Sequence, residues 1–153
     1  MSKSLARVKA ALEGVSAIVM ETGPANTAQM AADALGVEVD QIAKSIVFQG
    51  EASGEAVLFI TAGGNQVDAA KAAALAGEPL GRADANLVRA QTGFAIGGVS
   101  PVGHLNPIRA FLDPRLQAFS LVWAAAGTPR HVFSVSPADL ERLSGAQPAD
   151  FTA

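Results

Sequence analysis

The chain has 153 residues, half of them hydrophobic, with a formal net charge of −3 and no cysteine. This length suits one domain with one core, and the lack of cysteine excludes disulfides, thiolate metal ligands and a cysteine nucleophile. An acidic pI near 5.3 disfavours general DNA binding. No apolar run approaches the ~18 residues of a membrane span, so we expect one soluble domain over residues 1–153.

The first half of the chain alternates between helical and strand-like patterns. Its first fifteen residues are amphipathic and lack the apolar block of a signal peptide, so we expect a cytoplasmic protein. The patterns predict a helix over 4–12, a strand over 15–20, a helix over 27–36, a helical turn over 40–44, and strands over 45–49 and 56–62. The last two strands are joined by a polar turn and predict an antiparallel hairpin, with Lys44 at the mouth of the first strand.

The second half continues the mixture of helices and strands. It predicts a helix over 67–77, an extended segment over 78–83, a helix over 83–93 capped by Asp84, a strand between Pro107 and Pro114, a strand over 117–127, a strand over 131–135, and a helix over 136–145. The tail over 146–153 is expected to be loose. Together these elements predict a mixed α/β (α+β) domain without repeats or linkers.

A glycine-rich loop, Thr92 to His104, separates the helix over 83–93 from the later strands and reads TGFAIGGVSPVGH. Its four glycines permit positive φ and close approach of a ligand to the backbone, and Pro101 removes one backbone donor. From the residues alone, the loop is either an ordinary structural turn or the floor of a site that offers main-chain N–H groups to an oxygen.

The residues that several catalytic mechanisms require are missing from this chain. Two histidines without an HxH or HExxH spacing predict no metal site, and the phosphate-loop and dinucleotide motifs are missing, so we expect no cofactor. The sequence GGVSP is not a nucleophile elbow because Pro101 follows Ser100. Ser100 is therefore expected to form a polar wall of the loop.

Three features together resemble the YbaK/EbsC family of aminoacyl-tRNA editing domains, which are related to the insertion domain of bacterial prolyl-tRNA synthetase. They are Lys44 in AKSIVF, the GGxSPxGH loop over 97–104, and the segment TAGGNQVDAAKAAALAG over 61–77. The resemblance covers nearly the whole chain and implies a mixed, largely antiparallel, barrel-like sheet surrounded by helices. It also implies a freestanding hydrolase that removes a wrong, small amino acid from mischarged tRNA-Pro. The implied partners are the acceptor end of an aminoacyl-tRNA and a cognate aminoacyl-tRNA synthetase.

The resemblance also implies a set of site residues. Lys44 would supply a fixed positive charge, and backbone N–H groups of Gly97–Gly103 would stabilise the oxyanion of ester hydrolysis. The implied catalytic residues are Lys44, Gly98, Ser100 and Gly103, and the implied substrate-binding residues are Thr27, Ser45, Gly97, Pro101, His104 and His131. We expect His104 to fix the loop, while Thr27 is also a plausible helix N-cap and His131 an exposed residue at a strand end.

Other functions remain open at this point. A module that binds aminoacyl-tRNA or another nucleotide-bearing ligand without hydrolysing it is the main alternative, and a structural or cell-envelope regulator is a weaker one. A pocket of small residues would select by size, which leaves alanine, serine, threonine and cysteine as candidate amino acids.

Overall fold

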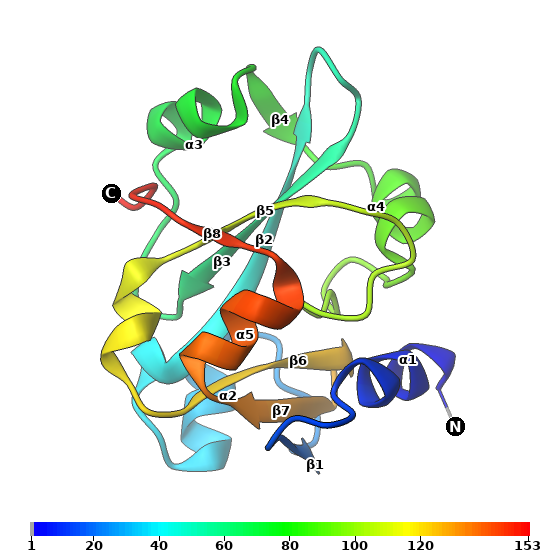
Figure 1. Cartoon of the computed structure of the whole chain (residues 1–153), viewed down its shortest axis with the longest axis vertical. Helices are drawn as coiled ribbons and strands as arrows, with labels where there is room; N and C mark the ends of the chain where they lie inside the picture. The colour runs from blue at the N-terminus through cyan, green and yellow to red at the C-terminus, as the bar shows by residue number, and fades with distance from the viewer. Residues whose placement is uncertain (1) are drawn as a thin grey trace.

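The computed structural model describes residues 2–153, in which all eight strands join one mixed sheet (Figure 1). The strands are β1 (Ile18–Glu21), β2 (Ile42–Gly50), β3 (Ala56–Ala62), β4 (Leu80–Arg82), β5 (Arg109–Leu112), β6 (Val122–Thr128), β7 (His131–Val135) and β8 (Gln147–Pro148). Their order is β1-β7-β6-β2-β3-β5-β8, and β4 pairs with β2. The expected mixed α/β fold is confirmed, and within the described residues the sheet stays open, because its terminal strands β1 and β8 do not pair.

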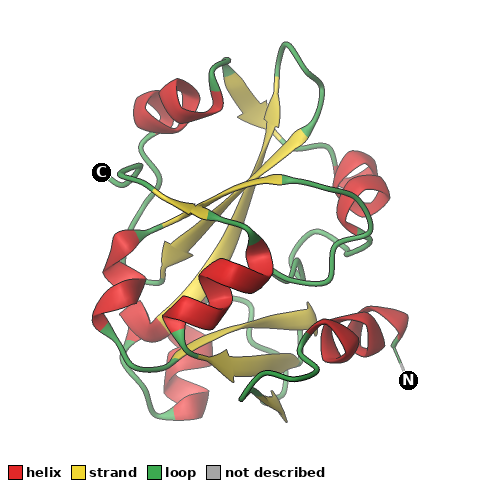
Figure 2. Cartoon of the chain, viewed as in Figure 1, coloured by secondary structure: helices red, strands yellow, loops and turns green. Residues whose placement is uncertain are grey.

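Five α-helices and two 3₁₀ turns connect the strands (Figure 2). They are α1 (Lys3–Ala11), α2 (Ala28–Leu35), η1 (Val39–Gln41), α3 (Ala69–Ala76), α4 (Ala85–Thr92), η2 (Pro114–Ala118) and α5 (Pro137–Ser144). Each α-helix begins after a residue whose side chain accepts a hydrogen bond from a backbone N–H three residues later; these N-caps are Ser2, Thr27, Asp68, Asp84 and Ser136. No helix of residues 2–153 has the length and apolar character needed to cross a bilayer.

Three expected boundaries differ from the structure by three or more residues. The strand expected over 117–127 begins only at Val122, because η2 extends to Ala118 and residues 119–121 connect it to β6. The helical turn expected over 40–44 covers only Val39–Gln41, because Ile42 and Ala43 already pair with β6. Lys44 is therefore the third residue of β2 and not its mouth. The first strand begins at Ile18, since Val15 and Ala17 pack against the core in a connecting segment.

Strand β2 divides the sheet into two parts. One edge of β2 pairs with β3 over seven residues, from Ala43 to Gln49. The other edge pairs with β6 only at Ile42–Ala43 and with β4 only at Phe48–Gly50. Residues 44–47 thus have no neighbouring strand on that edge, and β6, β7 and β1 form a separate group below β2 in Figure 1. We call this opening between β2 and β6 the seam.

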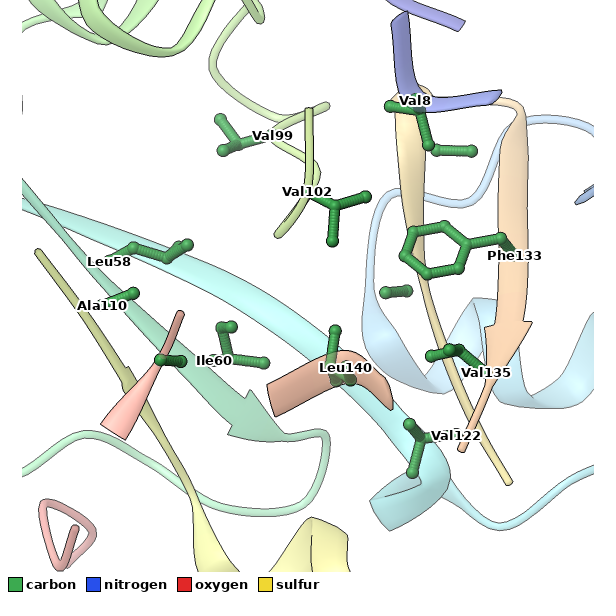
Figure 3. Close-up of a cluster of buried hydrophobic side chains, with 14 of the residues drawn as sticks. Val8, Leu58, Ile60, Val99, Val102, Ala110, Val122, Phe133, Val135 and Leu140 are labelled. Atoms are coloured by element: carbon green, nitrogen blue, oxygen red, sulfur yellow. The ribbon is translucent and has the colours of Figure 1, made fainter. Parts of the chain in front are cut away.

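The glycine-rich loop fills the core beside the seam. Val99 and Val102, at most 5% exposed, belong to the main hydrophobic cluster. Figure 3 shows Val102 between Leu58 on one side and Val8 and Phe133 on the other. The loop is therefore part of the core, whatever further role its backbone has.

The C-terminal tail is ordered, which corrects the expectation that residues 146–153 are loose. β8 pairs with β5, Thr152 bridges to Val67, and the carbonyl of Phe151 accepts a hydrogen bond from the Asp68 N–H at 2.7 Å. The Phe151 ring is fully buried and meets the edge of Phe59 at 5.0 Å between centroids. A lone aromatic residue in a short polar tail gave a weak sequence signal for this packing.

We predict that Phe151→Ala lowers the free energy of unfolding by about 3–5 kcal/mol, since it removes a fully buried ring. Urea denaturation measures the change. Asp150→Ala is the matched control, because that side chain is 75% exposed and its ion pair with Lys71 contributes about 1 kcal/mol or less. Equal stability of the two variants would mean that the tail is dispensable.

Candidate functional site

A cavity of about 600 Å³ opens at the seam, where β2 and β6 diverge. Its walls come from β2, β6 and β7, from the start of α2, from the turn at Gly63–Gly64 and from the glycine-rich loop. A volume of this size accommodates a small-molecule ligand. The polar lining residues are Asn26, Thr27, Gln29, Lys44, Ser45, Thr128 and His131.

The structure brings five of the ten expected site residues together at this cavity. Thr27, Lys44, Ser45, Gly97 and His131 line it, although they come from four different parts of the chain. The other five expected residues do not line it; they are Gly98, Ser100, Pro101, Gly103 and His104. The cavity therefore uses Gly97 and Val99 in the middle of the loop, and residues 100–104 pack elsewhere.

Lys44 is the cationic side chain of the cavity lining. Its Nζ donates a hydrogen bond to the carbonyl oxygen of Gly63 at 3.2 Å. Burial lowers the pKa of the Lys44 amine, and the nearby carboxylates of Asp40 and Asp113 act in the opposite direction. The amine is thus held at one wall, with further N–H bonds available for a ligand.

Two carboxylates hold the turn that supplies this carbonyl. Asp113 Oδ2 accepts hydrogen bonds from the Ala62 N–H at 3.1 Å and from Asn65 Nδ2 at 2.9 Å, and Asp40 Oδ1 accepts one from the Gly64 N–H at 2.8 Å. A Cβ at Gly63 would overlap the carbonyl oxygen of Val39, so glycine is required by close backbone approach. Sequence analysis missed Asp40 and Asp113, because an acidic residue beside a short helical turn is typical of an ordinary cap.

His131 lies on the opposite wall, at the start of β7. Its Nδ1 is hydrogen-bonded to Thr128 Oγ1 at 2.7 Å, and its Nε2 is 3.5 Å from a carboxylate oxygen of Glu21 on β1. These contacts orient the imidazole beside the cavity. The side chain is 23% exposed, so a ligand can reach it.

The loop divides at Val99 into a cavity half and a packed half. In the cavity half, Gly97 has φ +93° and open space around its α-carbon, whereas Gly98 does not have positive φ, contrary to expectation. The Gly98 N–H already donates to the Ala95 carbonyl at 3.0 Å. Among residues 2–153, the N–H groups of Gly97 and Val99 have no acceptor, and both residues line the cavity.

The packed half of the loop rests on α1. Ser100 is fully buried and its Oγ accepts a hydrogen bond from the Val102 N–H at 3.2 Å, while Pro101 is also buried. The Gly103 carbonyl accepts a hydrogen bond from Arg7 Nε at 2.8 Å. These contacts give Ser100 and Gly103 clear structural duties outside the cavity.

His104 ends the packed half. Its Nε2 is hydrogen-bonded to the Ser100 carbonyl, and its ring meets the Phe94 ring edge-on. Burial lowers the pKa of His104, the hydrogen bond to Ser100 opposes this shift, and the nearby charge of Arg7 adds to it. The imidazole therefore favours its neutral form inside the folded loop.

Two polar atoms of the lining residues are buried without a hydrogen-bond partner among the described residues. They are Ser45 Oγ and Trp123 Nε1. Sequence analysis did not include Trp123, whose indole packs with Ala31 and Ile42 at the apolar end of the cavity. Within residues 2–153, no three His, Asp or Glu side chains gather as a metal ion requires. The site offers an amine, an imidazole, a hydroxyl and free backbone N–H groups, a set suited to binding an ester or phosphate oxygen.

Comparison with known proteins gives consistent relatives. A family model described as "Aminoacyl-tRNA editing domain" matches residues 22–143. The chain is 34% identical over 118 residues to "Uncharacterized protein YwhH" of Bacillus subtilis (strain 168), which covers 77% of this chain and 74% of YwhH. It is 29% identical over 130 residues to "Putative Cys-tRNA(Pro)/Cys-tRNA(Cys) deacylase EbsC" of Enterococcus faecalis (strain ATCC 700802 / V583), covering 82% of this chain and 77% of EbsC.

A solved structure is similar over the full length. It is described as "a putative trans-editing enzyme for prolyl tRNA synthetase" and superposes with a TM-score of 0.89 at 49% identity, covering 100% of this chain and 99% of that one. The family match over residues 22–143 includes every residue that lines the cavity. The cavity at the seam thus lies within the shared fold.

The buried imidazole predicts a pH dependence of stability. Because the pKa of His104 is lowered in the folded chain, the unfolded chain takes up this proton first as the pH falls below about 6.5. The contribution is absent well above that pH and destabilises the fold progressively as the pH falls toward the folded pKa. Urea denaturation between pH 7.5 and 5 should show a smaller loss of stability in His104→Gln than in the wild type. Parallel losses in the two proteins would contradict the assignment.

Proposed function

Because this chain belongs to the aminoacyl-tRNA editing domain family, we propose that it is a freestanding, cytoplasmic trans-editing deacylase. Its substrate is tRNA-Pro mischarged with a small amino acid, and a cognate aminoacyl-tRNA synthetase is a second partner. The observation that carries the proposal is that Lys44 lines one cavity together with Gly97 and Val99, two loop residues whose N–H groups have no acceptor among residues 2–153. EbsC is described as a putative deacylase and the structural neighbour as a putative trans-editing enzyme, and both descriptions support the same reaction class.

The reaction is hydrolysis of the ester that joins the amino acid to the terminal ribose. Water adds to the ester carbonyl carbon, the carbonyl oxygen takes up negative charge, and the bond to the ribose oxygen then breaks while a proton passes to that oxygen. Backbone donors aimed at the developing oxyanion contribute about 3–4 kcal/mol each in other acyl-transfer sites. In this chain, the loop N–H groups and the Lys44 amine are the donors, with Gly97 and Val99 as the loop positions that line the cavity.

Size selection follows from the apolar end of the cavity. Ala25, Ala28 and Ala31, from α2 and the segment before it, line this end together with Trp123. Short side chains leave room for a small substituent, and each additional methylene changes binding by about 1–3 kcal/mol. Thr27, Ser45 and His131 line the same cavity and are the proposed substrate-binding side chains.

We predict that Lys44→Met lowers single-turnover deacylation at least tenfold, about 1.4 kcal/mol in the barrier, because the variant keeps the aliphatic stem and loses the charge. The assay follows release of alanine, serine, threonine, cysteine and proline from charged tRNA-Pro. Lys71→Met is the matched control, since Lys71 pairs with Asp150 away from the cavity. If the wild type binds these tRNAs and releases none of the amino acids, the protein is a binding module and not a deacylase.

The two halves of the loop should respond differently to substitution. Gly97→Val should reduce deacylation at least tenfold, since a β-branched residue is strained at φ +93° and its side chain enters the cavity. Ser100→Ala should lose about 1 kcal/mol of stability from one hydrogen bond and keep a rate within threefold of the wild type. Single-turnover rates with matched thermal melts measure both effects. Loss of turnover in a folded Ser100→Ala protein alone would identify Ser100 as a nucleophile and refute catalysis by the backbone.

A further inference from the structure

We propose that the buried carboxylate of Asp113 is a positioning residue that holds Lys44 in its working orientation through the Gly63–Asn65 turn. The inference rests on the proposed deacylation and adds a residue that does not itself line the cavity. Asp113 is 2% exposed and is the one buried acidic residue of the described chain. Burial of a charge is costly unless all its oxygens are satisfied, so such a residue needs a specific reason.

The position of Asp113 follows from the parallel pairing of β3 and β5. Leu112 is aligned with Ile60, and the Asp113 N–H donates to the Ile60 carbonyl at 2.9 Å. The Asp113 side chain therefore extends past the end of β3 and meets the first residues of the following turn. It reaches both the Ala62 N–H and the Asn65 side chain, on either side of Gly63 and Gly64.

The Gly63–Asn65 turn connects Asp113 to Lys44. The Gly63 carbonyl, which accepts the Lys44 hydrogen bond, lies between the two residues that Asp113 holds. The next N–H, that of Gly64, is held by Asp40. Arg115 links both carboxylates, because its N–H donates to Asp113 Oδ1 at 2.9 Å and its Nε donates to Asp40 Oδ2 at 3.0 Å. The carbonyl is thus clamped by a closed polar network.

The same carboxylates also stabilise the Lys44 charge. Asp40 on η1 and Asp113 after β5 both raise the pKa of Lys44 against the larger effect of burial. Arg115 is already bonded to Asp40, and His131 is the other titratable side chain that lines the cavity with Lys44. Removing either carboxylate should therefore lower the pH at which Lys44 loses its proton.

A purely structural duty for Asp113 makes a different prediction. Asp113 is also the N-cap of η2, and a cap alone would contribute stability without affecting Lys44. Asn65 separates the two possibilities, because Asn65→Ala removes a link from Asp113 to the turn and leaves the cap and both charges in place. Asp40→Asn tests the charge separately, since an asparagine oxygen can still accept from the Gly64 N–H.

The experiment compares Asp113→Asn, Asn65→Ala and Asp40→Asn with the wild type in single-turnover deacylation and in NMR titration of ¹³C-labelled lysine. The control is Asp84→Asn, which neutralises the N-cap of α4 and should leave both readouts unchanged. We expect Asp113→Asn and Asn65→Ala to lower the maximal rate at least fivefold, with substrate affinity within twofold. We expect Asp113→Asn and Asp40→Asn to shift the Lys44 titration to lower pH, and Asn65→Ala to leave it in place.

The outcomes separate this inference from the proposed function. If the wild type releases no amino acid, the deacylase proposal fails, while the Lys44 resonances of the variants still report its position and titration. Unchanged Lys44 signals and rates in folded Asp113→Asn and Asn65→Ala proteins would overturn the positioning role. Should Asp113→Asn fail to fold, Asn65→Ala decides the matter, because Asn65 is only partly buried and keeps the carboxylate intact.

Discussion

The short parallel pairing of β2 with β6 is the constraint on which the site depends. Two residues of each strand are aligned, and the strands then diverge. A longer ladder would satisfy more backbone groups and would also occupy the space of the cavity. Because β2 pairs with β4 only from Phe48 onward, Lys44 and its successors border this space. One long strand therefore anchors three neighbours and leaves its middle open for a ligand.

Polar groups around the opening are held in place by hydrogen bonds and packing contacts with neighbouring residues of the protein. Lys44 depends on the Gly63–Asn65 turn, and His131 depends on Thr128 and Glu21. The cavity half of the glycine-rich loop depends on Val99 and Val102, which are fixed in the core. These contacts fix the orientation of the polar groups before a ligand binds, as preorganised sites require.

The sequence predicted the helices well, because capping residues and glycines mark their ends within one or two residues. Thr27, Asp84 and Ser136 illustrate this, since each cap uses only local chemistry. The sequence was less informative about elements whose formation depends on long-range pairing. β8 has only two residues and forms because β5 is already in place, and Phe151 is buried by rings that are distant in sequence.

The candidate site shows the same limit. Lys44 and Gly97 were expected from a motif, and the structure places both at the cavity. The motif did not distinguish the two halves of the loop, because each half contains a glycine at positive φ. Gly97 lies beside the cavity, and Gly103 lies against α1. Asp113 was not predicted as a site residue, because its partners, Ala62 and Asn65, are about fifty residues away in the chain.

The seam also has a mechanical consequence. Two strand groups joined by so few backbone hydrogen bonds are held at their distance mainly by the side chains packed between them. Val102 is such a side chain, buried between Leu58 and Phe133 (Figure 3), and Val99 belongs to the same cluster. A close-packed interior resists a change of even one methylene. The width of the cavity, and with it the largest ligand that can enter, therefore depends on Val102, a core residue that does not line the cavity.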